Sequence, residues 1–285
     1  MPVKIVTDST SYIPKELVEE YDISIVSLNV ILNGISSKET DLDNIKFYED
    51  MDESNTIPTS SQPSLDDLLK IFKEKVSLGY DIVGIFLSSS MSGTYSSANL
   101  VKNMILEEYP NSRIEIIDSK TNCMQMGFEV LQAARAAKSG KEIEQVVDEA
   151  IKVRENSRFL FVPDTLKYLK KGGRIGGAAA LLGSILQIRP ILTVENGVTT
   201  VFDKVRTKKR AIDRIVDKVL DDIDDKGLGE IMVHHINCED EGKLLADRLA
   251  EKLKIPVKIQ YIGPIIGLHV GPGSIGVTYY TKENN

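Results

Sequence analysis

Two loops rich in hydroxyl groups contain the side chains of this sequence that are best suited to bind an anion. The first is Thr59-Ser60-Ser61-Gln62-Pro63-Ser64, and the second is Ser88-Ser89-Ser90-Met91-Ser92-Gly93-Thr94. Each loop leads into an expected helix, where free backbone N–H groups and the helix dipole favour negative charge and hydroxyls add donors. The two loops therefore predict a cradle for a carboxylate or a phosphate. Serine and threonine are also preferred helix caps, so capping alone is the alternative interpretation.

The third candidate is His269, which stands just before the turn Gly271-Pro272-Gly273. An imidazole on tightly turned backbone can donate a hydrogen bond to a carboxylate, and a solvent-facing or capping histidine is the alternative. His234 and His235 are neighbours within an expected strand. Their side chains then point to opposite faces, which favours packing in a core or an interface over chelation of a metal.

A glycine-rich run, Lys171-Gly172-Gly173-Arg174-Ile175-Gly176-Gly177, opens a segment of small and apolar residues. We expect residues 176–186 to form a buried helix, because they are apolar or small on every side. Such a helix either lines a narrow tunnel or packs closely against its neighbours.

Basic residues gather in two places, although 42 Asp and Glu residues against 35 Lys and Arg residues leave a net charge of −7. An acidic chain repels polyphosphates, so nucleic-acid binding is not expected. A basic cluster is either a solvated face or a docking surface for an acidic partner. The two clusters comprise Lys167, Lys170, Lys171 and Arg174, and Lys204, Arg206, Lys208, Lys209, Arg210 and Arg214.

Common catalytic and cofactor motifs do not fit this sequence. The run Gly271–Gly276 matches the dinucleotide fingerprint, but a strand rather than a helix is expected after it. A phosphate-binding P-loop and a GxSxG nucleophile motif are both missing, and Cys123 and Cys238 stand alone. We therefore expect no catalytic residue, no cofactor and no metal.

The sequence also bears on the location of the protein. Apolar stretches are shorter than the ~20 residues that span a bilayer, and a signal-peptide core is missing. Both observations predict a cytoplasmic protein.

The elements that must position these residues alternate between strands and helices, which is typical of an α/β fold with parallel strands. The dipeptide Asn196-Gly197 is a strong hairpin signal and makes a second sheet mixed. We expect two α/β domains: residues 1–156 with a mostly parallel sheet flanked by helices, and residues 157–285 with a mixed sheet and helices. In the second domain a helix is expected over residues 164–171, 208–222 and 239–253.

These motifs, taken in order, resemble those of the DegV family, the fatty-acid-binding subunits of bacterial fatty acid kinase. The resemblance covers essentially the whole chain, and six motifs in the family's order make it specific. The motifs are Val6-Thr-Asp-Ser-Thr10, Ser60-Ser-Gln-Pro-Ser64, Leu87-Ser-Ser-Ser-Met-Ser-Gly-Thr-Tyr95, Lys171-Gly-Gly-Arg-Ile175, Val205-Arg-Thr-Lys-Lys-Arg-Ala211 and His269-Val-Gly-Pro-Gly273.

The resemblance implies a long-chain fatty acid buried between or within the two domains, with the protein acting as a lipid-binding subunit and not as an enzyme. It implies that Ser60, Ser92 and His269 bind the carboxylate, together with Thr59 and Gly93. The family's first loop is usually Thr-Ser-Gln-Pro-Ser, and its threonine falls on Ser60 here, so either Thr59 or Ser60 supplies that hydroxyl. A threonine often precedes the histidine in the family, whereas this chain has Leu268.

The resemblance also implies a protein partner. An ATP-dependent kinase subunit with a dihydroxyacetone-kinase-like domain would convert the bound acid to an acyl-phosphate for phospholipid metabolism, with transient membrane contact on the way. Arg174, Arg206 and Lys208 are the expected docking residues. Two other functions stay open: a hydrolase or acyltransferase with Ser92 as nucleophile and His269 as base, or a binding module for another small carboxylate or phosphate.

Overall fold

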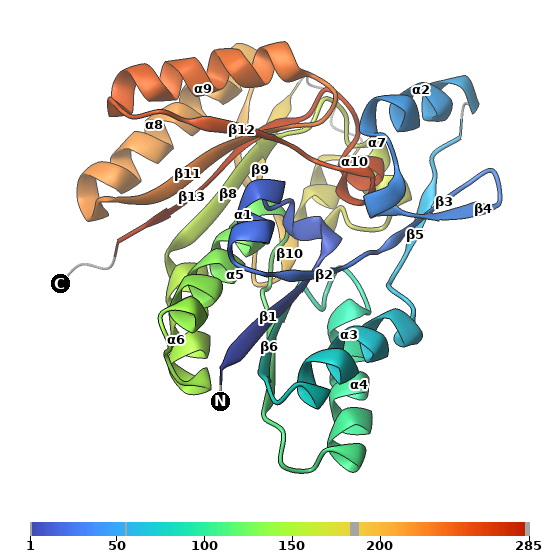
Figure 1. Cartoon of the computed structure of the whole chain (residues 1–285). Coiled ribbons are helices and arrows are strands. Elements are labelled where there is room, and N and C mark those ends of the chain that lie inside the picture. The colour runs from blue at the N-terminus through green and yellow to red at the C-terminus, as the bar shows by residue number, and fades with distance from the viewer. Residues whose placement is uncertain (1, 55, 183–187, 283–285) are drawn as a thin grey trace.

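The computed structural model describes residues 2–54, 56–182 and 188–282, in which the strands form three sheets (Figure 1). One sheet is fully parallel, with the order β2-β1-β6-β7. Its strands are β1 (Val3–Asp8), β2 (Ser24–Val26), β6 (Asp81–Phe86) and β7 (Ile114–Asp118). All six residues of β6 are buried, as expected for a parallel strand that is covered on both faces.

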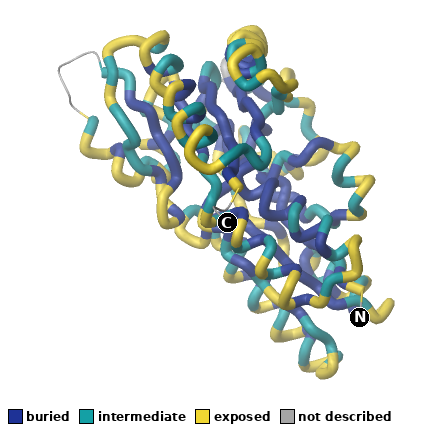
Figure 2. Tube along the Cα trace, turned by 90° about the vertical axis from the view of Figure 1, so that its left-hand side faces the viewer, coloured by how far each residue is buried: buried dark blue, intermediate teal, exposed yellow. Residues whose placement is uncertain are grey.

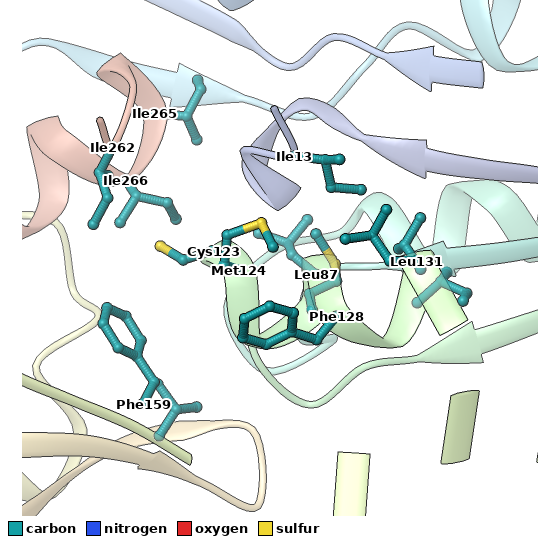
Figure 3. Packing of buried hydrophobic residues seen from close by; sticks show 14 of the residues in the cluster. Ile13, Leu87, Cys123, Met124, Phe128, Leu131, Phe159, Ile262, Ile265 and Ile266 are labelled. Carbon is teal, nitrogen blue, oxygen red and sulfur yellow. The ribbon is translucent and has the colours of Figure 1, made fainter. Parts of the chain in front are cut away.

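Helices cover both faces of the parallel sheet. On one face, α3 (Leu65–Ser77) and α4 (Thr94–Glu108) pack against alternate strand residues such as Val6 and Ile82. On the other face, α5 (Cys123–Lys138) and α6 (Ile143–Asn156) pack against the intervening residues, such as Ile5 and Val83. Figure 3 shows part of this second core, in which Met124, Phe128 and Leu131 of α5 gather around Leu87, with Ile13 above them. The period-two alternation of strand side chains thus produces two separate cores.

The second sheet has six strands in the order β10-β9-β8-β13-β11-β12, and it is mixed because only β11 and β12 are parallel. Its strands are β8 (Ser157–Val162), β9 (Arg189–Glu195), β10 (Val198–Val205), β11 (Leu228–His235), β12 (Lys258–Tyr261) and β13 (Ile275–Thr281). The helices α8 (Lys208–Lys226) and α9 (Glu239–Leu253) cover one face, and α5 and α6 lie against the other. The expected mixed sheet is confirmed. Asn196 and Gly197 both have positive φ, which the tight hairpin between β9 and β10 requires.

A third, antiparallel sheet has the order β4-β3-β5 and was not expected from the sequence. It consists of β3 (Asn29–Leu32), β4 (Ile35–Lys38) and β5 (Thr59–Ser61), and β5 contains the first hydroxyl-rich loop. The first 54 residues also contain the helices η1 (Ser9–Ser11), α1 (Lys15–Glu20), η2 (Glu39–Asp41) and α2 (Asn44–Ser54). These strands have only three or four residues, too few for a clear alternating pattern.

Two helices differ from the expectations. The prediction of a buried helix over residues 176–186 is wrong for the residues that the structure describes. There η3 (Gly176–Leu181) is a 3-10 helix in which Ala178 is buried and most of its neighbours are exposed. Residues 183–186 lie outside the described part. Gly176 has φ +49, which an α-helix does not permit, and small side chains have little apolar area to bury. The helix expected over 164–171 is shorter, α7 (Lys167–Lys171).

The layers therefore follow one another as α3/α4, parallel sheet, α5/α6, mixed sheet and α8/α9. Buried residues run through the middle of the molecule, and exposed residues lie along its outside (Figure 2). Strands of the parallel sheet come from before residue 156 and those of the mixed sheet from after it, while α5 and α6 pack against both. The division into domains of residues 1–156 and 157–285 stays a prediction. In the described part of the chain, every helix is too short or too polar to cross a bilayer.

Candidate functional site

A cavity of about 220 Å³ lies among residues of the small antiparallel sheet, the mixed sheet, the loops between elements and the short helix α10 (Pro264–Val270). This volume is more than ten times what one water molecule needs, so the cavity has room for a much larger ligand. Part of its wall is apolar and comprises Leu28, Leu87, Met91, Phe159, Phe161, Leu169, Val194, Ile265, Ile266 and Val270. Figure 3 shows Phe159 facing Ile262 and Ile266 from the opposite side of this region.

The polar part of the wall contains four of the five residues expected to bind a carboxylate. They are Ser60, Ser92, Gly93 and His269, and Ser61, Gln62, Asn122, Arg174 and Thr199 accompany them. Thr59 is exposed and does not line the cavity. Neighbouring residues of a strand point to opposite faces, so the register of β5 against β3 directs Ser60 inward and Thr59 outward.

His269 lies on α10, so it belongs to a helix that ends at the Gly271 turn and not to the turn itself. Its Nε2 atom is 2.9 Å from the Oγ atom of Ser60. Its Nδ1 atom is buried and has no hydrogen-bond partner in the described structure. A Cβ atom on Gly172 would stand 2.1 Å from Nδ1, so the ring packs directly on the backbone at Gly172.

The imidazole of His269 is neutral at pH 7. Burial, and secondly the positive charge of Arg174, lower its pKa from the ordinary 6.5 to about 4. The guanidinium of Arg174 donates to the carbonyls of Met91 (3.0 Å) and Gly172 (2.6 Å). It therefore holds the loop of Met91 beside the loop that supports His269.

Ser92 and Gly93 place the beginning of α4 at the cavity. The Oγ atom of Ser92 is 2.9 Å from Oγ1 of Thr94, and Gly93 is the N-cap of α4 without a side-chain cap. A Cβ atom on Gly93 would stand 2.1 Å from the side-chain oxygen of Gln62, whose amide donates to Ser97 Oγ at 2.8 Å. The two hydroxyl-rich loops thus meet, and the positive end of a 15-residue helix faces the polar wall.

Other serines of the second loop have structural roles. Ser88 Oγ donates to the carbonyl of Gly197 at 2.7 Å, and Ser89 Oγ donates to the carboxylate of Asp118 at 2.5 Å. The capping and turn interpretation therefore applies to these residues, whereas Ser92 lines the cavity.

A hydrolase mechanism with Ser92 and His269 would also need a carboxylate to orient the histidine, but the buried carboxylate of Asp8 is engaged elsewhere. It is fully buried and accepts hydrogen bonds from Thr10 N (2.9 Å), Thr10 Oγ1 (2.6 Å) and Leu87 N (2.8 Å). Burial raises its pKa to about 6. In the described residues His269 bonds to Ser60 and Ser92 bonds to Thr94, so the expected nucleophile and base are not hydrogen-bonded to each other.

The three expected docking residues lie in different surroundings. Arg174 lines the cavity, and Arg206 is exposed just before α8. Lys208 donates to the Gly273 carbonyl (3.0 Å) and pairs with Glu241 (2.6 Å).

His234 and His235 are both buried, as expected for packing histidines. No group of three His, Cys, Asp or Glu side chains suited to a metal ion occurs among the residues that the structure describes.

Sequence analysis missed the apolar wall and α10. Phe159, Phe161, Ile265 and Ile266 look like ordinary core residues in the sequence, because wall and core have the same composition. Gln62 belongs to the motif Ser60-Ser-Gln-Pro-Ser64, but no function was expected for its side chain, because its contact with Gly93 depends on the fold.

Comparison with known proteins decides the family. The sequence matches the family described as "Uncharacterised protein, DegV family" over residues 2–282. The chain belongs to the DegV family. It is 54% identical over 284 residues to a DegV domain-containing protein of Clostridium acetobutylicum, covering 100% of this chain and 99% of that one. It is 36% identical over 289 residues to Protein DegV of Bacillus subtilis, covering 99% and 100%.

Solved DegV structures have the same fold. The crystal structure of DegV, a fatty acid binding protein from Bacillus subtilis, aligns with a TM-score of 0.89 at 35% identity and covers 99% of this chain and 100% of that one. A stearic acid-binding protein from Eubacterium ventriosum aligns with a TM-score of 0.90 at 27% identity, covering 98% of both chains. A DegV family protein from Thermus thermophilus, described with fatty acid binding, aligns with a TM-score of 0.87 at 28% identity and covers 99% of this chain and 100% of that one. The α/β architecture expected for a DegV protein is confirmed.

Proposed function

We propose that this chain binds a long-chain fatty acid in the cavity and presents the carboxylate to a separate ATP-dependent kinase subunit. The observation that carries the proposal is a single cavity that combines an apolar wall with a donor-rich polar part at the start of α4. Its relatives from Bacillus subtilis and Eubacterium ventriosum are described as fatty-acid-binding proteins, which supports the same ligand class.

The carboxylate lies against Ser60, Ser92, the backbone of Gly93 and His269. An unpaired buried acceptor is tolerated better than an unpaired buried N–H, so the proton of neutral His269 belongs on Nε2, where it donates to Ser60 Oγ. The hydroxyl hydrogen of Ser60 is then free to donate to the ligand. Hydroxyl donors and a helix terminus favour an anion here, and the exposed guanidinium of Arg174 adds positive charge at the same cavity.

The tail lies along the apolar wall. A smaller cavity of about 10 Å³ shares Phe159, Phe161, Ile266 and Val270 with the main one and continues toward β13. Burial contributes ~0.8 kcal/mol per methylene, so a tail of about 14 methylenes gains roughly 11 kcal/mol before the costs of association. The tail therefore supplies most of the affinity, and the polar part of the wall fixes which end faces the kinase.

Presentation to a kinase needs a surface beside the carboxylate. Arg174 is exposed and lines the cavity, so it stands where the ligand's head and a partner meet. Arg206 offers an exposed positive charge on a chain whose net charge is −7. Electrostatic attraction to an acidic partner would act mainly on the rate of encounter.

The deciding experiment is mass spectrometry of the purified protein under native and denaturing conditions, with the extracted lipid identified. We expect one fatty acid per chain. The double variant Ser60→Ala/Ser92→Ala should lose acyl-phosphate formation with the kinase, whereas Thr59→Ala, an exposed hydroxyl on the same strand, should retain it. Full activity of the double variant would overturn the assigned carboxylate site.

Two results would favour other functions. A protein that neither contains nor takes up fatty acid, but binds a small carboxylate or phosphate, would be a different binding module. Covalent labelling by a serine-directed fluorophosphonate that disappears in Ser92→Ala would indicate a hydrolase or acyltransferase.

A further inference from the structure

A buried carboxylate outside the ligand cavity holds the start of α10. Glu39, which is 6% exposed, accepts hydrogen bonds from Ser9 Oγ (2.5 Å), Tyr12 Oη (2.8 Å) and the backbone N–H of Ile265 (2.8 Å). Tyr12 Oη in turn accepts from the N–H of Ile266 at 3.1 Å. Two backbone donors in the first turn of α10 thus bind residues that lie more than 220 positions earlier, with separations of 226 and 254.

The packing around this anchor leaves little freedom. A Cβ atom on Gly263, which precedes α10, would stand 2.7 Å from Glu39 Oε1 and 2.8 Å from the ring of Tyr12. A helix as short as the seven residues of α10 does not persist without tertiary contacts. Its position therefore depends on groups such as these.

The position of α10 matters to the cavity. Ile265 and Ile266, whose N–H groups are anchored, line its apolar wall, and His269 lies one turn further along the same helix. A displacement of the first turn would move the apolar wall and the Nε2 donor together.

We propose that Glu39 and Tyr12 are positioning residues that hold α10 against the cavity and thereby set how fast a bound ligand leaves. The part about release rests on the fatty-acid binding proposed above, whereas the anchoring of α10 exists without ligand.

A second cavity gives solvent access to the anchor. It has a volume of about 370 Å³, is lined by Ser9, Tyr12, Glu39 and Gly263 among others, and shares no described lining residue with the ligand cavity. Protons can thus reach Glu39 without opening the ligand cavity. The titratable groups that face Glu39 or line its cavity are Asp8 of β1, Tyr12, Lys15 of α1, Tyr48 of α2, Cys123 of α5 and Tyr261 of β12.

The charge on Glu39 should change near neutral pH. Burial raises the pKa of Glu39 to about 7. The donors that hydrogen-bond to Glu39 lower this pKa, and the negative charge of the neighbouring Asp8 raises it. A carboxylate accepts from an N–H more strongly than a carboxylic acid does. The anchor on Ile265 is therefore tighter at pH 8 than at pH 6, and release should be faster at pH 6.

Four variants test the proposal. Glu39→Leu removes the acceptor at similar size, Glu39→Gln keeps an acceptor but cannot ionise, and Tyr12→Phe removes one hydroxyl. Glu129→Gln is the matched control, because Glu129 is a fully buried carboxyl on α5 whose two oxygens have no hydrogen-bond partner in the described structure. The readouts are hydrogen exchange of a peptide spanning residues 262–270 in ligand-free protein, and the release rate of a fluorescent long-chain fatty acid.

We expect Glu39→Leu to accelerate exchange and release about ten-fold and Tyr12→Phe to accelerate them a few-fold, as for lost buried hydrogen bonds. Glu39→Gln, a neutral acceptor like protonated Glu39, should accelerate both less than Glu39→Leu does and should remove the difference in release between pH 6 and pH 8. Glu129→Gln should behave like wild type. Unchanged exchange in Glu39→Leu and Tyr12→Phe would overturn the anchor, and so would a wild-type pH profile in Glu39→Gln. If Glu39→Leu does not fold, hydrogen exchange and ligand release in Tyr12→Phe decide whether the anchor exists.

The two proposals can fail separately. A wild-type protein that binds no fatty acid, while Glu39→Leu still accelerates exchange at α10, would overturn the proposed function and support the anchor. Normal fatty-acid binding with exchange unaffected by any variant would do the opposite.

Discussion

His269 Nε2 lies 2.9 Å from Ser60 Oγ, although 209 positions separate the two residues in the sequence. The serine comes from a strand of the small antiparallel sheet, and the histidine comes from a helix between two strands of the mixed sheet. The polar part of the cavity is therefore assembled from opposite ends of the chain. Changes that displace either partner should be visible as a loss of ligand affinity.

Gly172→Ala should weaken fatty-acid binding. The new Cβ would stand 2.1 Å from Nδ1 of His269, so the ring must move away from Ser60. Gly172 has φ −74, which alanine adopts freely, so the effect comes from the clash and not from the backbone. Losing the neutral hydrogen bond that orients the Ser60 hydroxyl toward the ligand predicts a dissociation constant roughly two- to ten-fold higher by titration calorimetry. Gly177→Ala is the control, since its Cβ would meet Thr199 O at 3.7 Å, an ordinary contact; equal affinities in both variants would contradict the role of His269.

Phe159→Leu should shift the preference toward longer acyl chains. Phe159 lines both the main cavity and the smaller one beyond it, so a smaller side chain joins them. Each additional methylene buried should raise affinity about four-fold, at a cost to folding of about 1 to 2 kcal/mol. Competition between saturated acids of increasing length measures the shift. Phe128→Leu, in the same core but lining neither cavity, should lose stability and keep the wild-type preference.

Arg206→Glu should slow acyl-phosphate formation with the kinase and leave fatty-acid affinity unchanged. The side chain is exposed and does not line the cavity, so reversal of its charge acts on encounter with an acidic partner. A loss of about ten-fold is expected at low ionic strength and a smaller one in high salt. Lys70→Glu, an exposed position on α3, is the charge-matched control. Equal rates for the two variants would show that the kinase docks elsewhere.

His234→Gln should reduce the loss of stability that accompanies acidification. Burial lowers the pKa of His234 from 6.5 to about 4, while Nε2 accepts from Met124 N (3.2 Å) and Nδ1 faces the Gln260 carbonyl (3.1 Å). A group with a lowered folded-state pKa stabilises the protein above its unfolded pKa, and this contribution is lost as pH falls through 6.5 toward 4. The loss for His234 is about 2 kcal/mol between pH 7 and pH 5.

Urea unfolding of wild type and variant at both pH values gives this difference. Asp8 and Glu39, whose pKa values are raised to about 6 and about 7, act in the opposite direction in both proteins and cancel in the comparison. Identical changes of unfolding free energy in wild type and variant would contradict a neutral buried His234.

Local signals explain what could be predicted from the sequence. Ser64 caps α3 by accepting from Asp67 N at 3.1 Å, and the Asn196-Gly197 turn has the expected positive φ values. Both features depend on neighbouring residues alone. The hydroxyl-rich loops were found for the same reason, since a helix start and its donors are close in sequence.

The missed features depend on distant partners. The helix α10, with the sequence Pro-Ile-Ile-Gly-Leu-His-Val, shows no amphipathic period, and its first turn is held by Tyr12 and Glu39. The choice between Thr59 and Ser60 needed the pairing of β5 with β3, because a shift of one residue exchanges the two faces. The segment after Gly176 was assigned from composition, which does not reveal a positive φ.

The strand order of the mixed sheet constrains how the protein can be made. β13, residues 275–281, lies between β8 and β11, so β11 and β12 have no pairing with the rest of the sheet until this strand is in place. The parallel sheet needs only residues up to 118 and can form on the ribosome. The ligand cavity, in contrast, has lining residues up to Val270, so it is complete only after synthesis has passed α10. A ribosome-bound chain that stops before residue 275 should therefore leave the edges of β8 and β11 unpaired and exposed to chaperones and proteases.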